Sequence, residues 1–184
     1  MAFNVPNYDS KRFSFGPGIV YLGAPGTTPV IDVGAVKGDA ELNIERNALE
    51  MKQGSPQTLV KSYTVEENVS IKFTSVEWNL TNLAYALGAG VTSQSGADEI
   101  LGFGGDPDKS NRALRYVHKQ PDGSTIDIQL FKVEGAGSIA ISLKEADFHE
   151  FPVEFKVLEA TLNFQNATPS TNQKKFKIIR TVAA

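Results

Sequence analysis

The sequence predicts a mainly β protein: a β-sandwich or open barrel of roughly eight to ten antiparallel strands, flanked by one short α-helix at about residues 79–87. Three observations predict this fold. Apolar and polar residues alternate along most of the chain, as half-buried strands require. Only one segment has the period of a helix. Turn signals rich in Gly and Pro separate the segments, and neither a repeat nor a domain linker interrupts residues 1–184.

The first third of the chain combines an aromatic arm with two strands. Residues 1–17 contain aromatic side chains without a regular period, and we expect this N-terminal arm to dock on a neighbouring subunit. Residues 18–23 form a short strand. A second strand runs over residues 31–44, where Gly34 and Gly38 indicate a bulge or a close backbone approach.

The alternation weakens over residues 46–61, which are mixed in charge and contain a Gly-Ser-Pro turn at positions 54–56. We interpret this segment as a long hairpin loop that projects from the body. Loops of this length in compact domains are usually functional or disordered. A strand follows, in which Val69, Ile71 and Phe73 alternate with polar residues.

The predicted helix has recognisable ends. Asn79 is a good N-cap, Gly88 provides the left-handed residue that ends the helix, and Trp78 and Leu83 occupy the positions of a hydrophobic staple. The apolar residues of the helix fall on one stripe, which must pack on the sheet because so short a helix is marginal alone. The predicted helix core is Trp78, Leu80, Leu83 and Leu87, with Ala84 on the same stripe.

The second half is predicted to be strand almost throughout. A glycine-rich stretch to residue 111 contains one short strand at about 99–103, and the turn at Pro121–Gly123 joins two strands into a hairpin. The predicted strands are residues 112–119, 124–133, 138–143, 151–157 and the basic strand 175–182, the last within a C-terminal segment at 160–184.

Composition excludes several classes of function. The net charge of −3 argues against nucleic-acid binding through a basic surface. The absence of cysteine excludes disulfide scaffolds, thiolate metal sites and cysteine nucleophiles. We see no secretory signal and no apolar run of the ~20 residues that cross a bilayer, so we expect a soluble protein made in a cytoplasm.

The residues also disfavour an enzyme. His118 and His149 are the only histidines and lack the spacing of a zinc motif. The Asp106 loop lacks the central Gly and distal Glu of a calcium loop. The Gly-Phe-Gly-Gly run at 102–105 is not followed by the Lys-Ser/Thr of a phosphate loop, and there is no Gly-x-Ser-x-Gly elbow. We therefore expect no catalytic residue, cofactor or metal.

Five segments carry a resemblance to a known family. They are residues 23–34, the strand 41–46, the strand-to-helix segment 77–88, the Pro-Asp-Gly hairpin at 121–123 and the strand 151–158. In order and spacing, along nearly the whole chain, these pieces resemble the major tail tube proteins of tailed bacteriophages. No motif separates the tube of a flexible tail from that of a contractile one.

The resemblance implies a structural protein of the virion tail, assembled in the host cytoplasm. Its subunits would form hexameric rings that stack into the tube through which the genome leaves. The implied partners are further copies of the chain, the tape measure, tail terminator and baseplate or tip proteins, and genomic DNA passing without specific binding; no membrane is involved. The resemblance places ring stacking on the chain termini and on the projecting loop, that is on Leu49, Glu50, Met51, Lys52, Gln53, Ser55, Pro56 and Gln57.

The polar faces of the alternating strands suit the lining of a water-filled channel. The exposed edges of the outer strands would pair with neighbouring subunits in a closed ring. Lys37, Lys72 and Lys144 share these faces, yet we expect carboxylates to outnumber lysines there, with the basic strand 175–180 facing outward or a neighbour. The candidate lining residues are Asp39, Glu41, Asn43, Glu45, Glu66, Asn68, Ser70, Asp127, Gln129, Ser138 and Ser142.

Two alternatives remain open from the sequence. The first is a monomeric β-sandwich that binds carbohydrate or another virion protein, and such a module should show an exposed aromatic platform on one face. The second is a secretion-system tube of the same general architecture, which differs in cargo rather than in fold.

Overall fold

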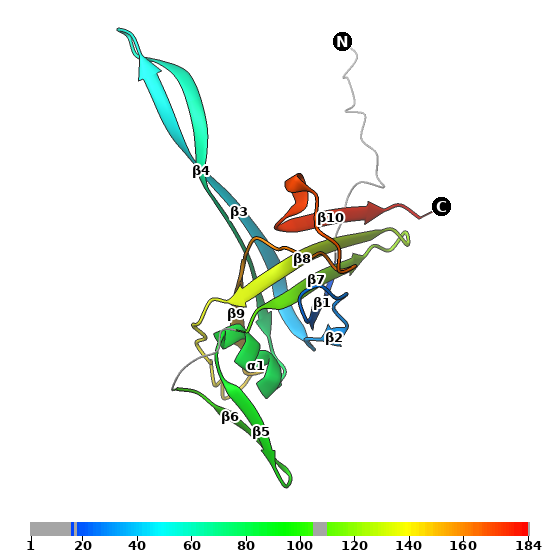
Figure 1. Ribbon diagram of the computed structural model, residues 1–184. Coiled ribbons are helices and arrows are strands. Elements are labelled where there is room, and N and C mark those ends of the chain that lie inside the picture. The colour runs from blue at the N-terminus through cyan, green and yellow to red at the C-terminus, as the bar shows by residue number, and fades with distance from the viewer. Residues whose placement is uncertain (1–15, 17, 105–109, 184) are drawn as a thin grey trace, which may run out of the picture.

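The computed structural model describes residue 16, residues 18–104 and residues 110–183, so the predicted N-terminal arm at 1–17 lies almost entirely outside the described residues. The main feature is one curved antiparallel sheet of eight strands, in the order β2-β1-β7-β8-β9-β4-β3, with β10 paired to β8 (Figure 1). These strands are β1 (Gly18–Gly23), β2 (Ile31–Asp32), β3 (Val36–Gln53), β4 (Thr58–Ser75), β7 (Arg112–Lys119), β8 (Thr125–Gly135), β9 (Phe151–Val157) and β10 (Phe176–Thr181).

A separate two-stranded ribbon consists of β5 (Val91–Ser95) and β6 (Asp98–Gly102), and the helix α1 spans Leu80–Leu87. A 3-10 turn, η2, covers Thr171–Gln173. The two ends of the eight-stranded sheet, β2 and β3, do not pair with each other, so the described chain contains no closed barrel. The predicted mainly β fold, with about ten antiparallel strands and one helix, is confirmed.

The main core lies on the face of the sheet that the alternation predicts to be buried. In β4, Val69, Ile71 and Phe73 are buried, and they pack with buried residues of β1, β7, β8 and β9 such as Leu22 and Leu130. Burying each of these side chains contributes about 1.5–3 kcal/mol. This shared core is what connects the early strands of the chain to the late ones.

Helix α1 begins and ends where the sequence predicts. The Asn79 side chain accepts a hydrogen bond from the Asn82 backbone N–H at 3.0 Å, and Gly88 has a left-handed φ of 68°. Gly135 of β8 allows the helix to pack closely, because a Cβ there would lie 2.3 Å from the Ala86 carbonyl oxygen. The helix C-terminus is therefore held directly against the sheet.

The predicted helix core needs one correction. Leu83 is buried, Leu80 and Leu87 are half-buried, but Trp78 is 51% exposed and is not a core residue. Its ring instead meets Phe151 edge-on at 4.6 Å, and its indole N–H donates to His149 Nδ1 at 3.4 Å. The buried residues of the helix are Asn82, Leu83, Ala84 and Ala86, so the buried face includes Asn82 and Ala86, which the predicted stripe did not contain.

A second, smaller core lies on the other side of β7 and β8. Ala160 and Phe164, from the segment between β9 and β10, pack on Ala113 and Phe131. The Phe131 and Phe164 rings meet edge-to-face with centroids 5.3 Å apart. This part of the predicted C-terminal segment therefore covers the outer face of the sheet over β7 and β8.

Three strand predictions were wrong in detail. Residues 46–61 are not a loop, because all but the turn at 54–57 belong to β3 and β4. Residues 138–143 form no strand, and of these residues only Ser142 makes a bridge, to Glu150. The sequence also missed β5, whereas the bulge expected at Gly38 is present as a register shift between Lys37 and Glu41.

Candidate functional site

The most prominent surface feature is the outer part of the β3–β4 hairpin, residues 46–67, called here the long ribbon. Its pairing runs from Arg46 opposite Glu67 to Gln53 opposite Thr58, and it projects far from the body (Figure 1). β9 pairs with β4 only over its last six residues, Ser70 to Ser75. Among the strands that the structure describes, none pairs with the ribbon as a third strand. At the base of the ribbon, the Lys175 ammonium donates to the Glu67 carbonyl oxygen.

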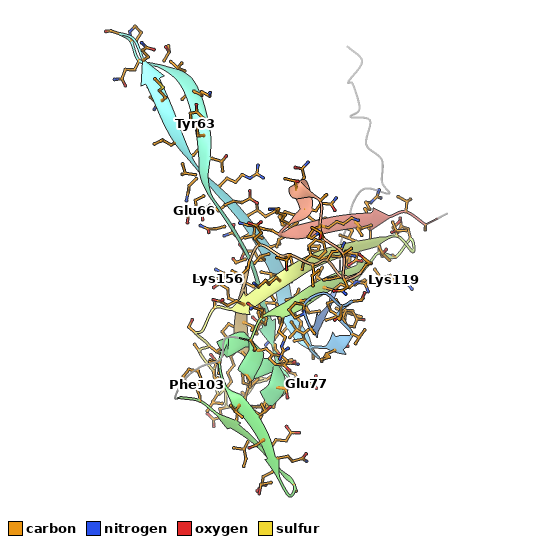
Figure 2. The ribbon with its side chains drawn as sticks, viewed as in Figure 1. Tyr63, Glu66, Glu77, Phe103, Lys119 and Lys156 are labelled. Atoms are coloured by element: carbon orange, nitrogen blue, oxygen red, sulfur yellow. The ribbon has the colours of Figure 1, made fainter. Side chains whose placement is uncertain are left out.

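The long ribbon exposes large apolar side chains to solvent. Six of them are between 52% and 66% exposed: Leu49, Met51, Leu59, Val60, Tyr63 and Val65. The register pairs Leu49 with Tyr63 and Met51 with Lys61, which puts these four on one face, called here the tip face. The Lys61 ammonium lies over the Tyr63 ring, 4.7 Å from its centroid, and Figure 2 shows Tyr63 on the outer half of the ribbon.

The other residues predicted to stack rings lie at or near the end of the same ribbon. Glu50 and Lys52 form an ion pair at 3.1 Å, and Gln53 accepts a hydrogen bond from the Thr58 hydroxyl at 3.0 Å. Alternation puts Glu50 and Lys52 on the face opposite the tip face. The turn contributes the exposed residues Ser55, Pro56 and Gln57.

The second feature is a continuous polar surface on the body side of the hairpin. Cross-strand pairs put Glu41 beside Lys72, Asn43 beside Ser70 and Glu45 beside Asn68. β9 extends this surface with Lys156 and Glu154. Two adjacent hollows follow it, and the residues that define this polar face are Asp39, Glu41, Asn43, Glu45, Glu66, Asn68, Ser70, Lys72, Ser138, Glu154 and Lys156.

The polar face is net acidic. Its five carboxylates and two lysines give the residues of the face a formal charge of −3. Glu66 accepts hydrogen bonds at 3.0 Å from the side-chain amides of Asn47 and Asn68, and these bonds hold the pKa of Glu66 below its usual value. Lys72 pairs with Glu154 at 3.6 Å. The side chains predicted from β3 and β4 therefore gather on one exposed surface.

Two predicted lining residues of β8 lie elsewhere. Asp127 and Gln129 are each only 9% exposed. The Arg115 guanidinium donates two hydrogen bonds of 2.9 Å to the Asp127 carboxylate, and the Gln129 amide donates a third at 2.9 Å. The bonds to Asp127 raise the pKa of Arg115 above its ordinary value. Asp127 and Gln129 thus form a buried polar cluster in this chain and not an open lining.

Ser142 is a third predicted lining residue that lies elsewhere, because it is outside the sheet and pairs only through the bridge to Glu150.

The lysines expected near the lining are largely neutralised by ion pairs. Lys37 pairs with Asp147 at 2.6 Å and with Glu150 at 2.9 Å, and Lys144 pairs with Glu150 at 2.7 Å. These bonds to Asp147 and Glu150 raise the pKa of Lys37.

The basic last strand does not have a single basic face. In β10, Lys177 stands opposite Gln129 and Arg180 opposite Ile126, so the two cations lie on opposite faces of the strand. The cations of this strand therefore lie on two surfaces of the chain, and the expectation that they face outward or toward a neighbour in an assembled tube stays a prediction.

Within the described part of the chain, no three His, Cys, Asp or Glu residues are grouped as a metal site would require. His118, in β7, is buried, and His149 accepts the Trp78 hydrogen bond. The Asp106 loop considered for calcium lies outside the described residues. Across residues 16, 18–104 and 110–183, no helix has the length and apolarity to span a membrane.

Comparison with known proteins adds no family assignment. No protein-family model matches the chain, and a search of curated proteins finds no relative. We therefore base the proposed function on two surfaces of the molecule, the long ribbon and the polar face.

Proposed function

We propose that the protein is a structural subunit that assembles with copies of itself into stacked rings, forming a tube of the phage tail type that conducts the genome into the host. The hexameric ring and the virion location come from the family resemblance of the sequence. The observation that carries the proposal is the long ribbon, whose six exposed apolar side chains have no partner surface within the described chain.

The ribbon is built for association and not for stability of the single chain. An isolated two-stranded hairpin is marginally stable in water at best. Contiguous exposed apolar side chains mark interaction sites, and an edge strand of 18 residues such as β3 offers unpaired backbone groups to another chain. In a ring or stack, both the apolar side chains and the strand edge are covered by neighbouring copies.

The polar face supports the role of a conduit. A channel for DNA must not hold the polyanion, and a lining rich in Lys and Arg would bind phosphates through counterion release. The net −3 of the polar face instead repels phosphates over a range of about 10 Å at ordinary salt. DNA, the tape measure protein and the terminator and baseplate or tip proteins are the partners this role implies.

A monomeric binding module is the second candidate, and one observation favours it. Trp78 is 51% exposed and Phe148 is 71% exposed, and Phe148 directly precedes His149, the hydrogen-bond partner of Trp78. Exposed aromatic side chains are what a carbohydrate or protein ligand would contact. Their area is small compared with the apolar surface of the long ribbon. A secretion-system tube would share the assembly and differ only in what passes through it.

Electron microscopy of the purified full-length chain, over a concentration series, tests the proposal. We expect rings or tubes above a threshold concentration, with sedimentation showing loss of the monomer over the same range. A matched variant, Leu49→Ser with Met51→Ser, should keep the same circular dichroism spectrum and raise that threshold. Monomers that persist at the highest concentrations would contradict self-assembly and favour the binding module.

A further inference from the structure

A second ribbon lies at the end of the molecule opposite the long ribbon. β5 and β6 extend beyond α1 as an isolated pair, pointing away from the body (Figure 1). The register pairs Val91 with Gly102, Ser93 with Ile100 and Ser95 with Asp98, while Leu101 points to the other face. Leu101 is the only half-buried residue of this short ribbon, so its face is the one toward the body.

The outward face of the short ribbon presents two exposed apolar side chains, two serines and an acidic residue near the turn. Val91 is 75% exposed and Ile100 is 46% exposed, and Asp98 follows on the same face next to the turn. We call Val91, Ser93, Ile100 and Asp98 the acceptor face. Phe103, directly after β6, is a further exposed apolar side chain at its body end (Figure 2).

The two ribbon faces match in chemistry. The tip face presents Leu49, Met51 and Tyr63 with one cation, Lys61, and the acceptor face presents apolar residues with one anion, Asp98. Both are backbone ribbons with free edges, so they can meet over a similar length of strand. Apolar contact would supply the affinity, and the single opposite charge on each face would set the register.

From this match we propose that the acceptor face of one copy receives the tip face of the next copy, head to tail. The proposal deepens the proposed function, on which it rests, by naming the receiving surface of the stack. A contact between two different surfaces at opposite ends of the folded molecule is heterologous. Each copy therefore contributes its tip face to one neighbour and its acceptor face to another, and the contact repeats along an axis. Lys61 and Asp98 are its charge pair.

A charge swap tests the pair. Lys61→Glu and Asp98→Lys should each raise the protein concentration needed for tubes by about tenfold or more, since like charges would then meet in the contact. The double variant restores opposite charges and should return assembly toward that of the wild type. Lys119→Glu and Glu99→Lys are matched controls, because Lys119 is an exposed cation of β7 outside both ribbons and Glu99 lies on the opposite face of the short ribbon.

Cross-linking tests the same contact without relying on tubes. The chain has no cysteine, so a Met51→Cys variant mixed with a Ser93→Cys variant has one thiol on each face. Oxidation by diamide should give a 51–93 disulfide between copies, seen by mass spectrometry. The control mixture of Ser62→Cys with Gln94→Cys, whose thiols lie on the opposite faces of the two ribbons, should give at least several-fold less.

The outcomes separate the two proposals. Tubes without the 51–93 disulfide would contradict the proposed role of the acceptor face but not the proposed tube. A double charge variant that assembles no better than the single variants would have the same consequence. The disulfide without rings or tubes would support the head-to-tail contact and overturn the tube. An absence of both tubes and disulfide would overturn both proposals.

Discussion

Replacing Leu83 by Ala perturbs the one helix at the point where it meets the sheet. Leu83 is 6% exposed and borders a void of only about 10 Å³ together with Phe73, Phe151 and Phe155. These three aromatic residues are held in paired strands. They cannot move in to fill the space left by the smaller side chain, so Leu83→Ala should create a lasting cavity.

The magnitude follows from two contributions. Shortening Leu to Ala removes three carbons from the core, which costs about 2 kcal/mol in transfer free energy. The cavity that remains adds to this, and a total of about 3–4 kcal/mol lies within the usual range for buried Leu→Ala changes. For a chain of 184 residues, that loss corresponds to a fall in melting temperature of roughly 10 °C.

Thermal and urea unfolding at concentrations below the assembly threshold measure this loss. Thr81→Ala is the matched control, because Thr81 lies on the exposed side of the same helix and its replacement should change the unfolding free energy by less than about 0.5 kcal/mol. A Leu83→Ala variant that unfolds within a few tenths of a kcal/mol of the wild type would refute the packing argument for α1.

Three further predictions concern assembly, the channel and pH. Deleting residues 52–57 should leave a folded monomer, because the ribbon adds little to the core, and should prevent stacking; full-length tubes seen by electron microscopy would contradict this. Glu41→Lys combined with Glu66→Lys changes the charge of the polar face from −3 to +1, so genome ejection should slow, and a normal ejection rate would exclude these residues from the lining. Hydrogen bonds from Lys37, and for Glu150 first from Lys144, lower the pKa of both Asp147 and Glu150. Their stabilisation of residues 136–150 should therefore persist at neutral pH and disappear as pH falls below about 4 and through the lowered pKa values. Limited proteolysis of that segment should show this loss, and Asp147→Asn with Glu150→Gln should remove the pH dependence.

The features that could be predicted from the sequence depend on local chemistry or on burial of one face. The ends of α1 are set by Asn79 and Gly88, whose side-chain and backbone preferences act within one turn of the helix. β4 and β9 show a clear alternation because their inner residues, such as Ile71 and Phe155, meet a core. In both cases the determining contacts leave a pattern within a short stretch of chain.

The long ribbon left no such pattern. Both of its faces are exposed in the single chain, so burial does not impose a period of two on residues 46–61. Register shifts after Asn47 and after Met51 also break whatever alternation remains. The strands are held by backbone pairing across the hairpin, which any residue except Pro can supply, and sequence reasoning therefore interpreted paired strands as a loop.

The misassignment of Asp127 has a different cause. Alternation correctly puts Asp127, Gln129 and Phe131 on one face of β8, away from the main core. It gives no information about what covers that face, and here Phe164 from a distant segment packs on Phe131 while Arg115 binds Asp127. A buried carboxylate needs such a partner, and breaking the pair would leave an uncompensated charge. Glu41 and Glu66 lie on exposed positions without such a cover, so the proposed channel lining comes from β3, β4 and β9. Asp127 instead stabilises the fold through its pair with Arg115.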